Sequence, residues 1–223
     1  MELNKIKVLS IFMIYIFCFI AHFLYVLFPS FFTSLLFPVN ESVWEHMKMI
    51  VSSIMIWGII LYFIFKKNNY YFDNFFLSVL CISLCCVIIF LIMYFPLCFF
   101  FGDSFILNVI LLFISIALSV NIGFRILNKE GYNLEFFAFL CIIFIFVLFG
   151  IFTYSPPKVP LFIDSRDGSY GISFDWIILL LLLCSLFFLL FLQMHLVLNI
   201  NYILCHLLDI YYIRLLLLSL FCF

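Results

Sequence analysis

The chain has 223 residues, of which 69% are hydrophobic and only 9% are charged, and its formal net charge is −1. An ordinary soluble domain carries roughly a quarter charged residues. A chain this apolar cannot cover itself with polar surface in water, which excludes a soluble fold and makes the lipid bilayer its expected partner. The few lysines and arginines form no basic patch, so nucleic-acid binding is excluded as well.

The hydrophobic residues fall in continuous runs of about 20 residues, the length of one helical bilayer crossing. A membrane barrel would instead show short segments of alternating polarity. Within lipid, every backbone N–H needs an internal partner, and a helix supplies it. The sequence therefore predicts an all-α fold, a polytopic bundle of about six transmembrane helices.

The predicted spans follow one another with short polar connections. The segment 29–39 between the first two spans is short, apolar and bounded by prolines, and it is expected to lie in the membrane interface or to dip into it. Pro96 is expected to end the third span, because proline interrupts a helix. The six predicted spans are 8–28, 40–65, 75–95, 105–124, 136–154 and 176–194.

Two regions are predicted along the chain. Residues 1–195 form the transmembrane bundle. The hydrophobic tail, 196–223, also contains Asn201, His206, Asp209 and Arg214, and this pattern fits either a seventh span or an interfacial helix.

The positive charges predict the orientation of the chain in the cell membrane, because cytoplasmic loops are enriched in lysine and arginine. Three such residues fall on one side of the predicted topology, namely Lys48, Lys158 and Arg166. Six fall on the side of the N-terminus, which is therefore expected in the cytoplasm: Lys5, Lys7, Lys66, Lys67, Arg125 and Lys129.

Polar side chains are concentrated where the second span begins, in the heptapeptide NESVWEH from Asn40 to His46. Asn40 is the expected N-cap, and Glu41 and Glu45 lie one turn apart on one face of the predicted helix. These groups are denser than capping requires, and charged groups beside a span indicate a function. The alternative is a capped helix start whose acids match the helix dipole, with Lys48 as their counterion.

The predicted topology brings a second polar segment, the loop 155–175, to the same face of the membrane. Its prolines favour an extended start, and the dipeptide Asp167-Gly168 favours a turn. The alternative is a solvated turn without a binding role. The candidate site for a small ligand, a lipid headgroup or a membrane protein partner comprises Asn40, Glu41, Trp44, Glu45, His46, Asp164, Arg166 and Asp167.

A histidine in the first span, His22, adds a candidate metal ligand. A short connection joins the first two spans, so they are expected to pack side by side and to bring His22 close to His46. Two imidazoles with Glu41 or Glu45 are a suitable ligand set for Zn²⁺ or a similar ion. The set taken as candidate ligands is His22, His46 and Glu45, and the alternative for each histidine is a simple hydrogen bond.

Two motifs carry a resemblance to a known family. VNESVWEHMK, residues 39–48, and FTYSPPKVPLFIDSRDGSYGI, residues 152–172, resemble the bacterial multi-span membrane proteins of domain of unknown function 6512. The resemblance covers about residues 1–195 and implies about six helices, with no established activity. The residues that it singles out are Asn40, Glu41, Trp44, Glu45, His46, Pro157, Pro160, Asp164, Gly168 and Gly171.

A looser similarity links the start of the second span to the progestin and adiponectin receptor superfamily, whose members resemble intramembrane zinc hydrolases. Asn40, Glu41, Trp44 and His46 match the opening motif of that superfamily. Its inner asparagine and its last-helix H-x-x-x-H are missing, so the similarity does not carry the activity over.

Two functions follow as hypotheses. The first is an integral membrane protein that binds a ligand or partner at its outer face, as a transport accessory for example. Polar mid-span residues, which transporters usually have, are sparse, and this argues against a lone ion pump. The alternative is a metal-dependent intramembrane hydrolase, in which the metal activates water and a carboxylate acts as the base.

Overall fold

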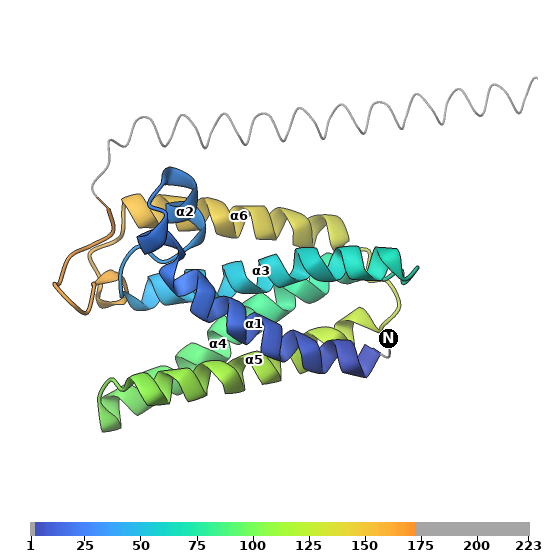
Figure 1. The fold of residues 1–223 in the computed structure, drawn as a ribbon, viewed down its shortest axis with the longest axis horizontal. Coiled ribbons are helices and arrows are strands. Elements are labelled where there is room, and N and C mark those ends of the chain that lie inside the picture. Colours follow the sequence, from blue (N-terminus) through green and yellow to red (C-terminus); the bar gives the residue numbers. More distant parts are fainter. Residues whose placement is uncertain (1–2, 173–223) are drawn as a thin grey trace, which may run out of the picture. The chain divides into compact units, whose positions relative to one another are not determined.

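In the computed structural model, the described part of the chain, residues 3–172, consists of α-helices joined by short loops (Figure 1). The predicted sixth span, 176–194, and the tail, 196–223, lie outside the described residues. The all-α prediction is confirmed for the part that the structure describes.

Five of the described helices are long and apolar enough to cross a bilayer, which is compatible with the predicted multi-pass membrane protein. Two shorter helices complete the described fold, α2 (Phe31–Leu36) and the 3₁₀-helix η1 (Pro160–Phe162). The five long helices are α1 (Leu3–Leu27), α3 (Val43–Lys67), α4 (Phe75–Phe101), α5 (Phe105–Leu127) and α6 (Glu135–Tyr154).

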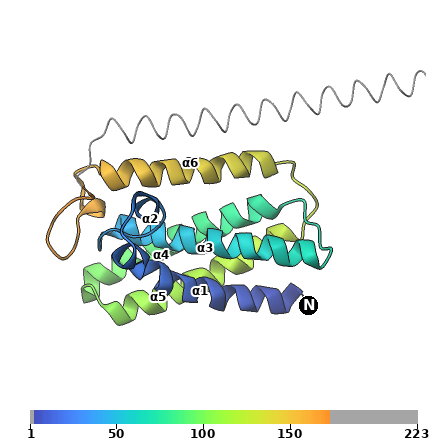
Figure 2. The same cartoon turned by 45° about the horizontal axis from the view of Figure 1, so that its top comes forward.

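The long helices lie roughly along one direction, and consecutive ones run in opposite directions (Figures 1 and 2). Helix α4 packs against α3, α5 and α6, while α1 packs against α3 and α5. The bundle therefore has two ends. The N-terminal end is where α1 begins and α3 ends, and the loop end is where α1 ends, α3 begins and α6 leads into residues 155–172.

The centre of the bundle is apolar, and several of its buried serines are satisfied within their own helices. The hydroxyls of Ser53, Ser83 and Ser115 each donate to the carbonyl four residues earlier in their own helix, at 2.8–2.9 Å. A hydroxyl that is paired within its own helix offers little to an ion or a substrate. The described mid-span serines are thus explained by packing.

The third predicted span is longer than the sequence indicated. Its predicted end at Pro96 is wrong, because α4 continues through Pro96 to Phe101. Proline removes one N–H and displaces one carbonyl, but membrane helices tolerate this where neighbouring groups satisfy the freed backbone. The helix ends instead at Gly102, whose φ of 74° lies in the left-handed region that glycine enters easily.

The segment between α1 and α3 folds back on the bundle through α2. Ser30 caps this helix by accepting the Thr33 N–H at 3.2 Å, and the Thr33 hydroxyl accepts the Ser30 N–H at 2.9 Å. This reciprocal capping box fixes a very short helix. Because α2 contacts α6, the chain enters α3 beside the end of α6, where residues 155–172 begin.

Candidate functional site

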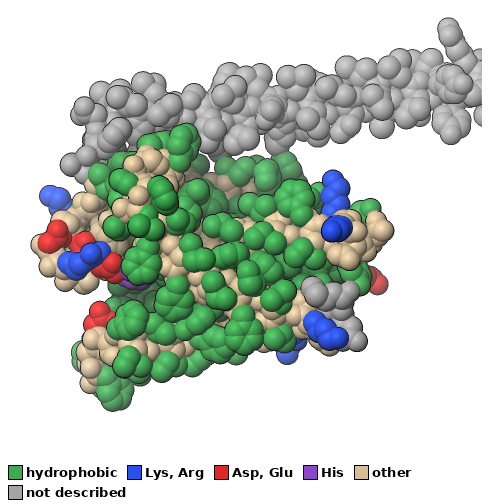
Figure 3. All heavy atoms as spheres, viewed as in Figure 1, with side chains coloured by type: hydrophobic (Ala, Val, Ile, Leu, Met, Phe, Trp, Pro, Cys, Tyr) green, Lys and Arg blue, Asp and Glu red, His purple; other side chains and the backbone are tan. Residues whose placement is uncertain are grey.

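Charged side chains gather at the two ends of the bundle, and hydrophobic side chains cover the surface between them (Figure 3). At the loop end, acidic, basic and histidine side chains lie together, whereas lysines and arginines prevail at the N-terminal end. An end that mixes all three kinds of side chain in a small area is the natural place to look for chemistry.

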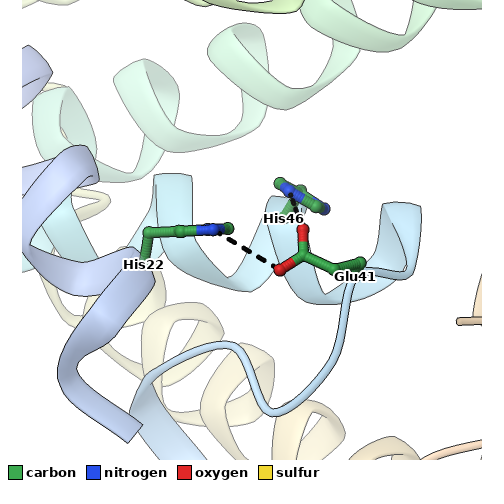
Figure 4. Close-up of side chains that lie close together, drawn as sticks. All are labelled: His22, Glu41 and His46. Carbon is green, nitrogen blue, oxygen red and sulfur yellow. Dashed lines mark ion pairs between the residues drawn. The ribbon is translucent and has the colours of Figure 1, made fainter. Parts of the chain in front are cut away.

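Three side chains from different segments converge at the loop end: His22 near the end of α1, Glu41 before α3, and His46 in the first turns of α3 (Figure 4). Glu41 Oε1 lies 3.5 Å from His22 Nε2, and Glu41 Oε2 lies 3.4 Å from His46 Nε2. The two imidazole rings are 5.5 Å apart between centroids. We call His22, Glu41 and His46 the His–Glu–His cluster.

Local backbone chemistry before α3 decides where Glu41 points. The N-cap is Ser42, whose hydroxyl accepts the Glu45 N–H at 3.3 Å, so the prediction that Asn40 is the cap is wrong. Asn40 Oδ1 instead accepts the Ser42 N–H at 3.0 Å, forming the short turn that asparagine favours. Glu41 therefore lies outside the helix, and the predicted helix face shared by Glu41 and Glu45 does not exist.

The His46 ring is oriented by its own helix. Its Nδ1 lies 2.9 Å from the carbonyl oxygen of Ser42. A carbonyl only accepts hydrogen bonds, so Nδ1 carries a proton and donates it. The other ring nitrogen, Nε2, is thereby turned toward Glu41, in the way a second contact orients a metal-binding histidine.

The loop after α6 closes over the cluster through Arg166. Arg166 Nη2 lies 2.6 Å from Glu41 Oε1, and the Ser165 hydroxyl donates to the Glu41 backbone carbonyl at 3.4 Å. Asp164 Oδ1 accepts the Arg166 N–H at 2.8 Å. The loop is thus attached to the residue that both histidines contact.

Glu41 is strongly held in its ionised form. A hydrogen bond with His46 and the charges of His22, His46 and Arg166 together hold its pKa at about 2, although partial burial opposes them. Its side chain keeps 26% of its surface exposed, so the carboxylate is shielded but reachable. A carboxylate that remains charged at all physiological pH values is a permanent partner for a cation.

Glu45 belongs to a different and deeper set of contacts. Its carboxylate accepts the Lys48 ammonium at 2.5 Å, and both side chains are almost wholly buried. Thr153 of α6 donates to Glu45 Oε1 at 3.2 Å and accepts from Lys48 at 2.8 Å, while Lys48 also donates to the Ser34 carbonyl at 2.8 Å. We call Ser34, Glu45, Lys48 and Thr153 the buried network.

The structure therefore separates the predicted site residues into two groups. The metal set predicted from the sequence was His22, His46 and Glu45, but the carboxylate beside the two imidazoles is that of Glu41. Arg166 contacts Glu41 of the His–Glu–His cluster, and Asp164 contacts Arg166. The Asp167 carboxylate turns to its own loop, where it accepts the Ser169 N–H at 2.8 Å. Hydrogen bonds from the Ser169 hydroxyl and N–H lower its pKa.

The described ring contacts of Trp44 and the described hydrogen bond of Asn40 are with residues beside the His–Glu–His cluster and not with the cluster itself. The Trp44 ring packs against Phe149, Phe152 and Phe162, with centroids 4.9–5.6 Å apart. Within residues 3–172, neither Trp44 Nε1 nor Asn40 Nδ2 has a hydrogen-bond partner, although both atoms are buried. Trp44 thus joins the start of α3 to the end of α6 and to η1.

Sequence reasoning named Lys48 as a counterion of the acidic residues, and it pairs with Glu45. Thr153 and Ser34 were missed as its further partners. A signal for Lys48 was present, because a lysine inside an apolar span is costly unless it is paired. The threonine and serine carried no such signal, since these residues are common in membrane helices and usually bond to their own backbone.

The donor set of the His–Glu–His cluster suits a borderline divalent ion. Its three ligand atoms all lie within 4.8 Å of one another. A tetrahedral zinc ion with bonds of about 2.0–2.1 Å separates its ligands by about 3.3 Å, so small side-chain movements would close the cluster around an ion. The Ser42 carbonyl contacts Nδ1 of His46 and therefore leaves its Nε2 available as a metal ligand.

The sequence model of the family DUF6512, a family of unknown function, matches residues 1–172, which are most of the chain. The chain therefore belongs to this family, and the match ends before the expected limit at residue 195. Comparisons with curated proteins and with solved structures found no match.

Proposed function

We propose that this member of the DUF6512 family is a multi-pass membrane protein that binds a divalent transition-metal ion, with Zn²⁺ as the model ion, through His22, Glu41 and His46. The ligand at the loop end would then be the ion itself. The proposal makes the sequence prediction of a ligand site more specific, and it replaces Glu45 by Glu41 as the acidic ligand.

The proposal rests on the contact between the Nε2 atom of His46 and the Glu41 carboxylate. Because His46 Nδ1 must donate to the Ser42 carbonyl, a neutral His46 has a lone pair on Nε2. That lone pair lies 3.4 Å from a carboxylate oxygen, which also carries only lone pairs. Two such atoms face each other favourably only with a cation between or beside them, either a second ring proton or a metal ion.

The ligand set favours the metal ion. Glu41 is the carboxylate of the cluster, and Asp164, with a side chain only 9% exposed, lies 3.9 Å from Arg166 Nε. Arg166 is the one lysine or arginine side chain that the described contacts place on Glu41. His22 offers a second imidazole 3.5 Å from the same carboxylate, and two imidazoles with one carboxylate form a recurrent zinc ligand set.

The test is the metal content of detergent-purified protein. We expect near-stoichiometric zinc or another transition metal in the wild type, and loss of most of it in His46→Ala and Glu41→Gln. Asp167→Asn is the matched control, because it removes a nearby carboxylate that turns away from the cluster. Metal-free wild type that also fails to bind added zinc, or equal metal in all variants, would contradict the proposal.

A metal-dependent intramembrane hydrolase is the second candidate, favoured by the number of ligands. Three protein ligands leave one tetrahedral position for water, which is the arrangement of catalytic zinc sites. The expected result is ester or amide hydrolysis by zinc-loaded protein that disappears in His46→Ala. A zinc-loaded protein with no such activity on a broad substrate panel would leave metal binding as the function.

The orientation with a cytoplasmic N-terminus in the cell membrane also belongs to this proposal. Lys48 no longer counts as a loop charge, because it is fully buried in the bundle. The loop end then carries Lys158 and Arg166, against six lysines and arginines at or near helix ends of the N-terminal end. The positive-inside rule favours this orientation more strongly than before, and the metal site would face outward.

A further inference from the structure

We infer that Arg166 is a built-in competitor for the metal ion: it pairs with Glu41 and must leave that carboxylate when an ion binds. This inference rests on the proposed metal site. It assigns Arg166 a role in setting the affinity and selectivity of the metal site. It also implies that the protease accessibility of the loop 155–172 changes when an ion binds.

The contacts of one carboxylate oxygen lead to this conclusion. Glu41 Oε1 lies 2.6 Å from Arg166 Nη2 and 3.5 Å from His22 Nε2. An ion held by both imidazoles and by Glu41 would lie close to the guanidinium, because His22 Nε2 and Arg166 Nη2 both approach Glu41 Oε1. Two positive charges at that distance from one oxygen repel each other, so the ion and Arg166 compete.

Arg166 is held in this position by a hydrogen-bonded turn. The Asp164 backbone N–H donates to the Ser169 carbonyl at 2.9 Å, and the Gly168 N–H donates to the Asp164 carbonyl at 2.9 Å. Gly168 has a φ of 73°, which the turn requires. The turn thus presents Arg166 to Glu41, and its release from Glu41 frees a side chain that is already 63% exposed.

Competition of this kind discriminates between cations. Mg²⁺ and Ca²⁺ prefer several oxygen ligands and gain little from two imidazoles. Zn²⁺ and Cu²⁺ gain from both histidines and from the carboxylate. Only ions of the second kind would displace the guanidinium, so Arg166 would act as a specificity-determining residue without itself binding the metal.

The first experiment compares zinc affinity in full-length, detergent-purified protein. We expect Arg166→Gln to bind Zn²⁺ about fivefold more tightly than the wild type, the size expected for a partly exposed charge pair. Lys158→Gln is the matched control, because it removes another exposed positive charge from the same loop, and its affinity should equal that of the wild type. Equal affinity of Arg166→Gln and wild type would overturn the inference while leaving the metal site intact.

The second experiment uses limited trypsin digestion of the wild type with and without Zn²⁺. Trypsin cuts after Arg166 and after Lys158, and the ratio of the two cuts cancels any effect of zinc on the protease. We expect zinc to raise cleavage after Arg166 relative to Lys158, because the ion releases Arg166 from Glu41. An unchanged or lower ratio in zinc-bound protein would refute the competition, whereas no zinc binding by any variant would refute the site itself.

Discussion

Glu41 shows how a single residue can link three segments. It precedes α3, touches one histidine on α1 and one on α3, and pairs with Arg166 from the loop after α6. Each of these contacts favours the charged carboxylate. At the residue scale, the contacts that join these three segments at the loop end therefore depend on the ionisation of the Glu41 carboxylate.

This dependence predicts a pH effect on stability. The folded pKa of Glu41, about 2, is below its ordinary value of 4.5, so its stabilising effect is fully present above pH 4.5 and disappears as the pH falls toward 2. We expect the thermal midpoint of the wild type to drop over this range more than that of Glu41→Gln. Melting curves in detergent between pH 2 and 7 would measure the difference.

Glu130→Gln is the control for this measurement, because Glu130 is an exposed carboxylate at the N-terminal end of the bundle. Its acid sensitivity should match that of the wild type. If Glu41→Gln lost stability with falling pH as steeply as the wild type, Glu41 would not be the group responsible.

At the element scale, the first turns of α3 serve two different environments. His46 faces α1 and the partly exposed cluster, whereas Glu45 and Lys48 face α2 and α6 in the buried network. Glu45 also accepts the Val39 backbone N–H at 3.0 Å, two residues before Glu41. The buried network therefore fixes the segment that carries the acidic ligand of the cluster.

Breaking the buried pair is expected to be costly. Lys48→Met leaves the Glu45 carboxylate buried without its counterion, and such losses typically cost 3–5 kcal/mol. We expect the free energy of unfolding to fall by about 3 kcal/mol, measured by denaturant titration in mixed micelles. Lys158→Met removes an exposed lysine and should change it by less than about 0.5 kcal/mol.

The double variant Glu45→Gln with Lys48→Met tests the explanation. Because it removes both charges, it should be more stable than the sum of the two single effects implies. Additive effects would show that Lys48 stabilises the protein through its packing and not through Glu45.

At the scale of the whole molecule, the described helices form a bundle with an uncharged centre and two chemically different ends. The outer surface exposes many large apolar side chains, among them Phe12, Phe23, Phe63 and Phe144, as expected where lipid is the solvent. Most lysines and arginines of the described part lie at the N-terminal end, whereas the loop end combines acidic and basic side chains with histidine (Figure 3).

This asymmetry predicts the orientation of the protein in the membrane. We expect loop residues around Lys67 and Lys129 to be cytoplasmic and residues around Lys158 to be external, because lysines and arginines resist translocation. Accessibility of epitope tags inserted at these loops, in intact and in permeabilised cells, measures this. Tags near Lys158 that are reached only after permeabilisation, with tags near Lys67 reached in intact cells, would reverse the orientation.

The sequence by itself determined the helical fold and the approximate positions of the described spans, although α4 runs past its predicted end at Pro96. Continuous apolar runs leave the backbone no other way to satisfy its hydrogen bonds in lipid, so local composition suffices. The sequence also located the polar segments 40–46 and 155–172, because charges are conspicuous among apolar residues.

Only the tertiary structure decided that Glu41 contacts the histidines and that Glu45 is buried with Lys48. A cap at Ser42 instead of Asn40 moves the start of α3 by two residues, and this shift turns Glu41 and Glu45 to different sides. The partners Ser34, Thr153 and Arg166 come from segments far away in sequence, so no local pattern encodes their contacts. Helix periodicity fixes directions within one element, whereas the choice of partner depends on how α1, α2, α3 and α6 pack together.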